Sequence, residues 1–322
     1  MMETKVYLGV DVGSISANIV AVTGQAEVMA QTYRRVEGHP IRSVQRALRE
    51  VRRALPESVR VAGVGTTGSG RVLVGAVLGA DIVKNEISAH ARAALRLHPD
   101  VQTILEIGGQ DSKITIVRDG VVVDFAMNLV CAAGTGSFLD SQAKRLNITI
   151  EELSERAVLS RNPTGIAGRC TVFAESDMIH KQQVGCAQDD ILMGLCQAMV
   201  RNYLSNVCKG KEIREPIVLQ GGVSANKGIG RAFKEILGRD VIIPRYNMVM
   251  GAYGAALIVS GHDGKTTRFR GFDACDREIA TPSFVCRDCP NLCEVIEIVD
   301  GGELLGRSGG RCLKWEGTSG PR

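Results

Sequence analysis

The chain has 322 residues, of which 44% are hydrophobic and 23% are charged, and its formal net charge is +4 at pH 7. This length suits two domains of ordinary size, and the composition supplies enough apolar residues for a buried core. The weak positive charge and the 4% of aromatic residues argue against nucleic-acid binding, which needs basic patches and stacking platforms. The arginines between residues 42 and 53 have helical spacing and indicate a solvent-exposed helix face.

We expect a cytoplasmic protein without a membrane span. The first residues lead directly into an apolar strand pattern, without the features of a signal peptide. The longest apolar stretches, 72–80 and 248–260, are too short and too rich in glycine to cross a bilayer. Because cytosolic thiols stay reduced, the ten cysteines are interpreted as buried thiols or metal ligands and not as disulfides.

The first predicted elements form a β-hairpin. Residues 5–11 and 17–23 are strand-like and are separated by a glycine- and serine-containing turn. The pattern then predicts a helix over 41–55, a strand over 60–64 and a helix over 86–97.

A second hairpin begins at residue 103. Its predicted strands cover 103–107, 113–118 and 121–125. The unit of strand, glycine turn and strand therefore occurs twice, at 8–22 and 105–117. This weak repeat suggests two related lobes that face each other across a cleft.

The remaining elements complete a prediction of two lobes and an appendage. We expect helices from 135 to 209, a strand, glycine loop and helix over 217–237, and a closing helix over 248–260. The composition becomes charged and irregular after Gly261. The predicted domains are a first lobe of residues 1–100, a second lobe of residues 101–260 and a cysteine-rich segment of residues 261–322.

The first glycine loop suggests a magnesium and phosphate site. Asp11 is expected to hold Mg²⁺, usually through water, because a carboxylate repels phosphate but binds this ion. The backbone at Gly13 can approach a phosphate oxygen closely, and the Ser14 hydroxyl can donate a hydrogen bond.

A second loop repeats this arrangement at residues 106–111. Glu106, Gly108 and Gly109 are candidates for nucleotide binding, and Gln110 or Asp111 is expected to position the water that attacks the γ-phosphate. Each loop taken singly is equally well explained as a tight turn.

A third loop, at Gly221 and Gly222, precedes a predicted helix and suits a close approach of ribose or adenine. Three such loops in this order favour nucleotide binding more strongly than one. The sequence lacks the Gly-x-x-x-x-Gly-Lys-Ser/Thr motif of P-loop NTPases. It also lacks an N-terminal Gly-x-Gly-x-x-Gly that opens a helix, which disfavours a nicotinamide dehydrogenase.

Two cysteines are candidates for a metal cluster. Cys131 and Cys170 each precede a predicted helix, where backbone N–H groups stabilise a thiolate. The alternative is that both are small buried hydrophobic residues. Because a cubane cluster commonly takes four cysteine ligands, two per chain imply a symmetric homodimer with the cluster on its axis. Cys186, Cys196 and Cys208 lack ligand-like spacing and are interpreted as core, surface or helix-end thiols.

The C-terminal segment carries a second candidate metal site. Its four cysteines have compact spacing that suits zinc or an iron–sulfur cluster, with unliganded surface thiols as the alternative. An iron–sulfur cluster there could relay electrons, whereas zinc would hold the fold of the segment. The candidate ligands are Cys286, Cys289, Cys293 and Cys312, with Cys275 as a possible fifth.

Three runs of residues resemble one family. They are EIGGQDSK at 106–113, NLVCAAGTG at 128–136 and CTVFAES at 170–176. They resemble the activator ATPases of 2-hydroxyacyl-CoA dehydratases and the ATP-binding subunits of benzoyl-CoA reductases. The order of the loops resembles the two-lobed α/β fold of actin, the Hsp70 ATPase domain and sugar kinases, which is ribonuclease H-like. The resemblance covers residues 4–260, and Glu106 departs from the aspartate of many relatives of the wider fold.

The resemblance implies an ATPase that uses ATP and Mg²⁺ to drive electron transfer. It implies a [4Fe-4S] cluster that bridges two subunits and is ligated by Cys131 and Cys170. The implied electron donor is ferredoxin or flavodoxin, and the implied acceptor is a low-potential iron–sulfur enzyme such as a dehydratase or a reductase. Two alternatives are a small-molecule kinase of the same fold and a nucleotide-switched scaffold.

Overall fold

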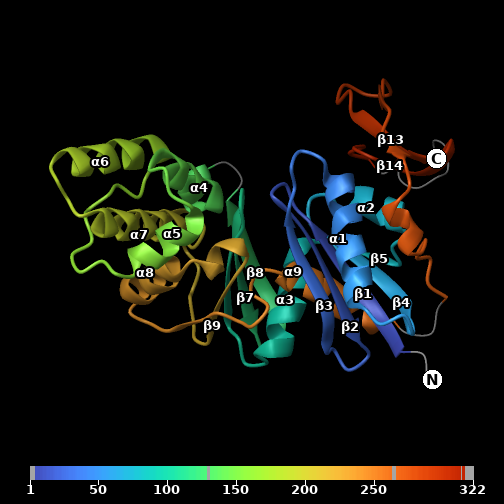
Figure 1. The fold of residues 1–322 in the computed structure, drawn as a ribbon, viewed down its shortest axis with the longest axis horizontal. Coiled ribbons are helices and arrows are strands. Elements are labelled where there is room, and N and C mark those ends of the chain that lie inside the picture. The colour runs from blue at the N-terminus through green and yellow to red at the C-terminus, as the bar shows by residue number, and fades with distance from the viewer. Residues whose placement is uncertain (1–3, 129–130, 263–265, 313, 316–322) are drawn as a thin grey trace. The chain divides into compact units, whose positions relative to one another are not determined.

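The computed structural model describes the chain except for residues 1–3, 129–130, 263–265, 313 and 316–322 (Figure 1). Contacts divide it into two compact units, Met1–Ala93 with Gly251–Arg322, and Ala94–Met250. The closing helix and the cysteine-rich segment therefore pack with the first unit, whereas the sequence had placed that helix in the second lobe. In the part of the chain that is described, no helix combines the length and the apolar character that a membrane span requires.

The first unit is built on a five-stranded sheet with the order β3-β2-β1-β4-β5. Strand β1 pairs antiparallel with β2 and parallel with β4. The elements are β1 (Thr4–Val12), β2 (Ser16–Thr23), β3 (Val28–Arg35), α1 (Pro40–Ala54), β4 (Val59–Thr67), α2 (Arg71–Leu78), β5 (Ile82–Val83), α3 (Glu86–Leu97) and α9 (Met250–Ser260). The predicted first hairpin and the helices over 41–55 and 86–97 are confirmed. Helix α3 carries the chain from the first unit into the second.

Alternation along β1 divides the first unit into two layers. Val6, Leu8 and Val10 are buried in a cluster that also contains the apolar residues of α1 and α2. The buried apolar side chains of α1 recur at intervals of three and four residues, which places them on one helix face. The opposite face of β1 carries Gly9 and packs against α9.

Gly9 is required by this packing and not by a phosphate. A Cβ atom at Gly9 would lie 1.8 Å from the carbonyl oxygen of Ala252 in α9. In β4, a Cβ at Gly65 would lie 2.5 Å from the oxygen of Ala255. Glycines in two neighbouring strands thus allow α9 to contact the sheet at backbone distance.

The second unit repeats the sheet topology of the first. Its order, read as β8-β7-β6-β9-β10, matches β3-β2-β1-β4-β5 strand by strand. In both sheets the central strand pairs antiparallel with the next strand in sequence and parallel with the fourth strand of its unit. The internal repeat predicted from two glycine turns is therefore confirmed for whole sheets.

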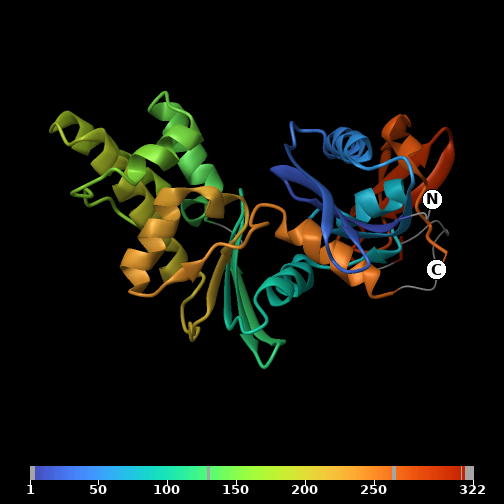
Figure 2. The same ribbon diagram turned by 60° about the horizontal axis from the view of Figure 1, so that its bottom comes forward.

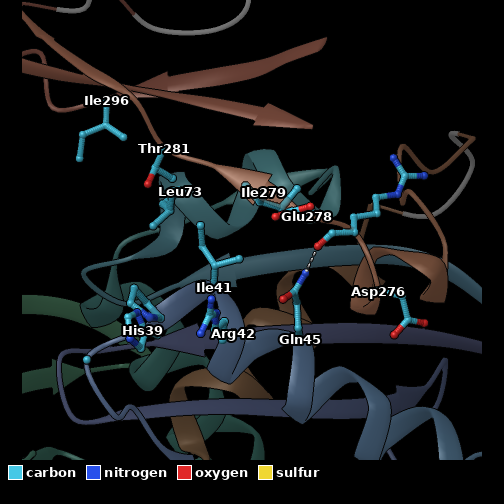
Figure 3. A pocket seen from close by; sticks show the side chains of 13 residues that line it. His39, Ile41, Arg42, Gln45, Leu73, Asp276, Glu278, Ile279, Thr281 and Ile296 are labelled. Carbon is cyan, nitrogen blue, oxygen red and sulfur yellow. Dashed lines mark hydrogen bonds between the residues drawn. The ribbon is translucent and has the colours of Figure 1, made fainter. Parts of the chain in front are cut away.

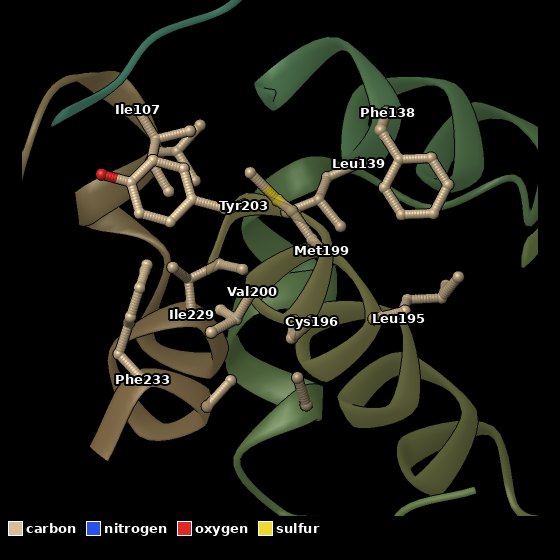
Figure 4. Close-up of a cluster of buried hydrophobic side chains, with 14 of the residues drawn as sticks. Ile107, Phe138, Leu139, Leu195, Cys196, Met199, Val200, Tyr203, Ile229 and Phe233 are labelled. Atoms are coloured by element: carbon tan, nitrogen blue, oxygen red, sulfur yellow. The ribbon is translucent and has the colours of Figure 1, made fainter. Parts of the chain in front are cut away.

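Helices cover one face of the second sheet (Figures 1 and 2). Leu105, Ile107 and Ile114 of the sheet join a core that includes Leu139, Tyr203 and other helical side chains (Figure 4). The elements are β6 (Thr103–Ile107), β7 (Ser112–Arg118), β8 (Val121–Asn128), α4 (Gly136–Arg145), α5 (Ile150–Ala157), α6 (Thr171–Gln183), α7 (Gln188–Asn206), β9 (Ile217–Gln220), α8 (Lys227–Leu237) and β10 (Val241–Ile242).

The C-terminal segment is more ordered than its composition predicts. It forms a four-stranded antiparallel sheet of β11 (Ile279–Ala280), β12 (Ser283–Val285), β13 (Glu294–Asp300) and β14 (Glu303–Ser308), preceded by a short 3₁₀ helix, η3 (Phe272–Cys275). Ile298 and Leu305 are buried in the core of the first unit. Cys275 lies in the same core, so it is a packing residue and not the fifth metal ligand considered from the sequence.

Helix α1 holds this segment in place. The Gln45 amide donates hydrogen bonds to the carbonyl oxygens of Ala274 and Arg277, at 3.1 and 2.8 Å. Arg49 forms an ion pair with Asp276 at 2.8 Å. Beside these contacts lies a cavity of about 540 Å³ between the N-terminal end of α1 and the C-terminal segment (Figure 3). The arginine-rich face of α1, which was predicted to be exposed to solvent, therefore packs in part against the C-terminal segment.

The close approach of β1 and α9 makes Gly9 a sensitive position. We expect Gly9→Ala to destabilise the protein by about 3 kcal/mol, because the added methyl group would displace helix backbone. Urea unfolding followed by circular dichroism measures this change. Gly24→Ala is the matched control, since a Cβ there meets no atom within 4 Å. Equal stability of the two variants would contradict the packing described.

Candidate functional site

Asp11 lies between two glycines of the first unit. A Cβ atom at Gly251 would be 2.2 Å from Asp11 Oδ2, and one at Gly68 would be 2.6 Å from Oδ1. A Cβ atom at Gly251 would also be 2.8 Å from His90 Nε2, so the imidazole lies beside the carboxylate. Gly68, His90 and Gly251 were not among the site residues predicted from the sequence.

The rest of the first loop is a tight hairpin turn. The Gly13 N–H donates to the Ser16 carbonyl oxygen at 2.9 Å, and Ser14 is exposed at the turn. Gly13 would have to give up this bond to donate to a phosphate, whereas the Ser14 side chain is already accessible. The neighbouring loop is tied to it, because the Gly70 N–H donates to the Val12 oxygen at 2.8 Å.

The second loop contains a buried lysine, Lys113, that the sequence pattern did not indicate. Lys113 Nζ lies 3.0 Å from Glu106 Oε1 and 2.8 Å from Asp111 Oδ2. The Lys113 side chain is 3% exposed and that of Glu106 is 7% exposed, so the ammonium group depends on its carboxylate partners for stabilisation. Lys113 was part of the recognised EIGGQDSK run, but its buried position depends on the pairing of β6 with β7.

This ion pair distinguishes Gln110 from Asp111. Asp111 uses one carboxylate oxygen to bind Lys113, and its carbonyl accepts the Gly108 N–H at 2.9 Å. Gln110, at the tip of the same loop, is exposed. Of the two residues predicted to orient water, Gln110 is the more accessible and Asp111 is the more constrained.

The third loop packs directly on the second. Gly221 has a φ of +91°, and a Cβ there would lie 2.5 Å from the Ile107 carbonyl oxygen. Its N–H donates to Asn247 O at 2.9 Å. Gly222 begins a short 3₁₀ helix, η2 (Gly222–Ala225). The structure therefore brings Glu106, Gly108, Gly109, Gln110, Asp111, Gly221 and Gly222 into one region of the second unit.

The second loop also binds the start of α4. The Gly136 N–H donates to Gly108 O at 2.9 Å, and the Ser137 N–H donates to Gly109 O at 2.8 Å. These are N–H groups of the first turn of α4, which have no partner inside the helix. The candidate nucleotide loop therefore takes the place of a side-chain cap for the helix that follows Cys131.

Cys131 immediately precedes a short 3₁₀ helix, η1 (Ala132–Gly134), and α4 begins at Gly136, close to the helix start predicted at residue 135. Asn128, the last residue of β8, fixes its backbone from both sides. The Asn128 Oδ1 atom accepts the Cys131 N–H at 2.9 Å, and its amide group donates to the Cys131 carbonyl oxygen. The first N–H groups of α4 bond to the glycine loop. The turn that directly follows the Cys131 thiol is η1 and not α4.

Cys170 fits its prediction, because it is the residue immediately before α6. Asn202 of α7 is fully buried and holds the approach to Cys170, donating to the carbonyl oxygens of Gly168 and Arg169 at 3.0 and 2.9 Å. A Cβ at Gly134 would lie 3.0 Å from Asn202 Oδ1, so the loop after Cys131 contacts the same side chain. One asparagine thus supports both cysteine loops.

The other cysteines of the second unit have different surroundings. Burial raises the pKa of Cys196 and of Cys208 to about 12, which keeps both as neutral thiols. Cys186 lies between α6 and α7 and is partly buried. Cys131 and Cys170 are both partly exposed, unlike Cys196 and Cys208, and could therefore reach a shared metal group.

Four cysteines of the C-terminal segment lie near one end of its sheet. Cys286 follows β12, Cys293 precedes β13, and the Cys286 N–H donates to the Cys293 carbonyl at 2.8 Å. Cys289 and Cys312 are exposed. Within the described ranges, no three of these sulfur atoms lie within 4.8 Å of one another.

Residues 8–259 match the model of the BadF/BadG/BcrA/BcrD ATPase family. The (R)-2-hydroxyglutaryl-CoA dehydratase activating ATPase of Acidaminococcus fermentans is 33% identical over 253 residues, which are 78% of this chain and 95% of that protein. A protein of Methanocaldococcus jannaschii is 30% identical over 80% of this chain, but this chain spans only 63% of its length.

A solved structure agrees with the fold. The activator of the 2-hydroxyisocaproyl-CoA dehydratase from Clostridium difficile, with bound ADPNP, has a TM-score of 0.74 at 31% identity. The similarity covers 80% of this chain and 95% of that chain. The predicted two-lobed α/β fold is therefore confirmed.

Asn202 provides a test of how the cysteine loops are held. We expect Asn202→Ala to destabilise the protein by about 3 kcal/mol, because a buried side chain is removed and two carbonyl groups lose its hydrogen bonds. Thermal and urea unfolding measure the change. Gln197→Ala on the same helix is the control, expected to cost less than about 0.5 kcal/mol because its amide bonds only to exposed Glu235. A similar loss in both variants would show that Asn202 has no special supporting role.

Proposed function

Because the chain belongs to the BadF/BadG/BcrA/BcrD ATPase family, we propose that it is an ATP-dependent activator of a partner metalloenzyme. It would accept an electron from ferredoxin or flavodoxin and deliver it, with hydrolysis of ATP, to a dehydratase or reductase. Relatives named as dehydratase activators and as a benzoyl-CoA reductase subunit support this class of partner. The expected location is the cytoplasm.

The observation that carries the proposal is the pair of hydrogen bonds between the second glycine loop and α4. Gly108 and Gly109 belong to a loop suited to nucleotide, and their carbonyls bind Gly136 and Ser137. These two residues lie within six positions of Cys131. A nucleotide-dependent movement of the loop would therefore be transmitted to the cysteine segment through backbone hydrogen bonds.

The residues at Cys131 and Cys170 fit a bridging [4Fe-4S] cluster. Both thiols are partly exposed, and both loops are held on buried Asn202. When bound, such a cluster supplies one-electron transfer at low potential. The chain's contribution is to present two thiolates from loops that contact Asn202, so that a second chain can supply the other two.

The surface beside Cys170 supports a homodimer. Val172 and Phe173, in the first turn of α6, are 66% and 63% exposed. Two adjacent, largely exposed apolar side chains are typical of residues that a partner covers. A second copy, joined through the shared cluster, is the partner that the two-cysteine arrangement requires.

The nucleotide loops receive individual roles. Asp11 holds Mg²⁺, Ser14 donates to a phosphate, and Gln110 orients the attacking water, with Asp111 as the alternative. Lys113 fixes Glu106 and Asp111, so it positions the loop and does not itself carry out the reaction. Gly221 and Gly222 allow ribose or adenine to approach the backbone.

The cluster assignment is tested by Cys131→Ser. We expect the variant to lose its iron and its electron transfer, while ATP binding stays within about threefold of the unaltered protein. Iron analysis, the visible spectrum of anaerobic protein and ATP titration measure these properties. Cys186→Ser is the control and should retain the iron. A bridging cluster that persists in Cys131→Ser would refute the ligand assignment.

The water-positioning role is tested by Gln110→Ala. We expect kcat for ATP hydrolysis to fall about 100-fold with little change in KM, since the residue acts on the attacking water and not on ATP binding. Gln31→Ala, an exposed position on β3, is the control. If Asp111→Asn lowers kcat and Gln110→Ala does not, the role belongs to Asp111. The alternative function, a small-molecule kinase, would instead be revealed by ATP-dependent transfer of phosphate to a metabolite.

A further inference from the structure

The hairpin of β12 and β13 places three cysteines around one loop. Ser283, Phe284 and Val285 pair with Ile296, Val295 and Glu294, so the strands run in register up to their last residues. Cys286 and Cys293 are the next residues on the two strands, and the Cys286 N–H donates to Cys293 O. Cys289 lies within the connecting loop, where its carbonyl accepts the Leu292 N–H at 3.3 Å.

Strand β14 returns the chain to this end of the sheet. Ser308, its last residue, pairs with Ile296 of β13. The following Gly309 has a φ of +108°, and a Cβ there would lie 2.3 Å from the Glu294 carbonyl oxygen. The chain that leads to Cys312 therefore passes beside the residue that follows Cys293.

The residues after Cys312 also contact the hairpin. Lys314 forms an ion pair with Asp288, which lies between Cys286 and Cys289. The ring of Trp315 meets that of Phe284 edge to face, with centroids 4.9 Å apart. Contacts on both sides of Cys312 thus hold it at the end of the sheet where the other three cysteines lie.

This end of the sheet has little core of its own. The buried apolar residues Val295, Ile298 and Leu305 lie along the strands, whereas Cys289 and Cys312 are exposed. The packing residues Cys196 and Cys275 are 0% and 3% exposed, whereas Cys286 is 8% exposed and Cys293 is partly exposed. Small structures with a limited core are commonly completed by a metal or another cross-link.

We propose that Cys286, Cys289, Cys293 and Cys312 form a second metal centre with four thiolate ligands. The spacings of two and three residues between the first three cysteines lie within the range of structural zinc sites, and four thiolates also suit an iron–sulfur cluster. Since no three of these sulfur atoms lie within 4.8 Å in the described structure, binding draws the loop and the segment of Cys312 together.

The proposed metal centre would cross-link the cysteine-bearing end of the C-terminal sheet. The rest of this sheet and the segment before it contact the first unit directly. Gln45 and Arg49 fix the segment that leads into the sheet, and Gly306 packs on α2, where its Cβ would lie 3.0 Å from Ala76 Cβ. Arg287, Arg311 and Lys314 lie next to the ligands in sequence and offset the negative charge of four thiolates. The segment follows the range matched by the family, so this site is separate from the one at Cys131 and Cys170.

The experiment uses the full chain with Cys131→Ser and Cys170→Ser, so that metal at the proposed bridging site cannot contribute. Zinc, iron and sulfide are measured after anaerobic purification, and Co²⁺ is added to metal-free protein. We expect about one zinc ion or one iron–sulfur cluster per chain, or tetrahedral thiolate–cobalt bands, and loss of each on adding Cys286→Ser and Cys289→Ser. Zinc and iron analyses distinguish the two kinds of centre.

Cys186→Ser in the same background is the matched control and should retain the metal. Metal content and cobalt spectra that do not depend on Cys286 and Cys289 would overturn the proposal, whatever the outcome at Cys131 and Cys170. Retained ATP binding by the tail variant shows that the rest of the chain is folded.

A second measurement needs no substitution in the tail. In metal-loaded protein, Cys289 and Cys312 should resist alkylation, although their side chains are exposed, because thiolates bound to metal are not free nucleophiles. Chelation should restore labelling at least tenfold, as detected by peptide mass spectrometry. Equal labelling before and after chelation would also overturn the proposal.

Discussion

The hydrogen bonds from Gly136 and Ser137 to the carbonyls of Gly108 and Gly109 are the constraint on which the second unit depends. They satisfy N–H groups that every helix leaves open at its start, and the partner is a loop instead of a capping side chain. The loop is itself fixed by buried Lys113 and by the third glycine loop at Gly221. A change at one of these loops therefore cannot leave the start of α4 unaffected.

The cysteine loops are supported from the opposite side by α7. Asn202 binds the segment before Cys170 and contacts the loop after Cys131, and the next residue, Tyr203, donates from its hydroxyl to Lys113 O at 2.7 Å. Two consecutive residues of one helix thus contact the cysteine loops and the nucleotide motif. If a nucleotide binds at this loop as proposed, the shared support would give a physical route between it and the thiols that does not require a flexible linker.

The C-terminal segment is a separate part of this framework. It packs on α1 and α2 of the first unit, and its cysteine-bearing end is the part with the least core. A metal there would stabilise the segment itself, whereas metal at Cys131 and Cys170 would serve electron transfer. Cysteine thiolate ligands would then have a structural role in the first unit and a redox role in the second.

Local features could be predicted from the sequence alone, because strands, turns and glycine loops follow from neighbouring residues. The sequence predicted the repeated hairpin and the EIGGQDSK run that marks the family. It could not place Lys113 between two carboxylates, assign Asn202 to both cysteine loops or put α9 against Gly9. Each of those contacts joins residues from different elements, so only the packing of sheets and helices decides them. The same reason explains Cys275, which the sequence offered as a possible fifth ligand and which the structure buries in the core of the first unit.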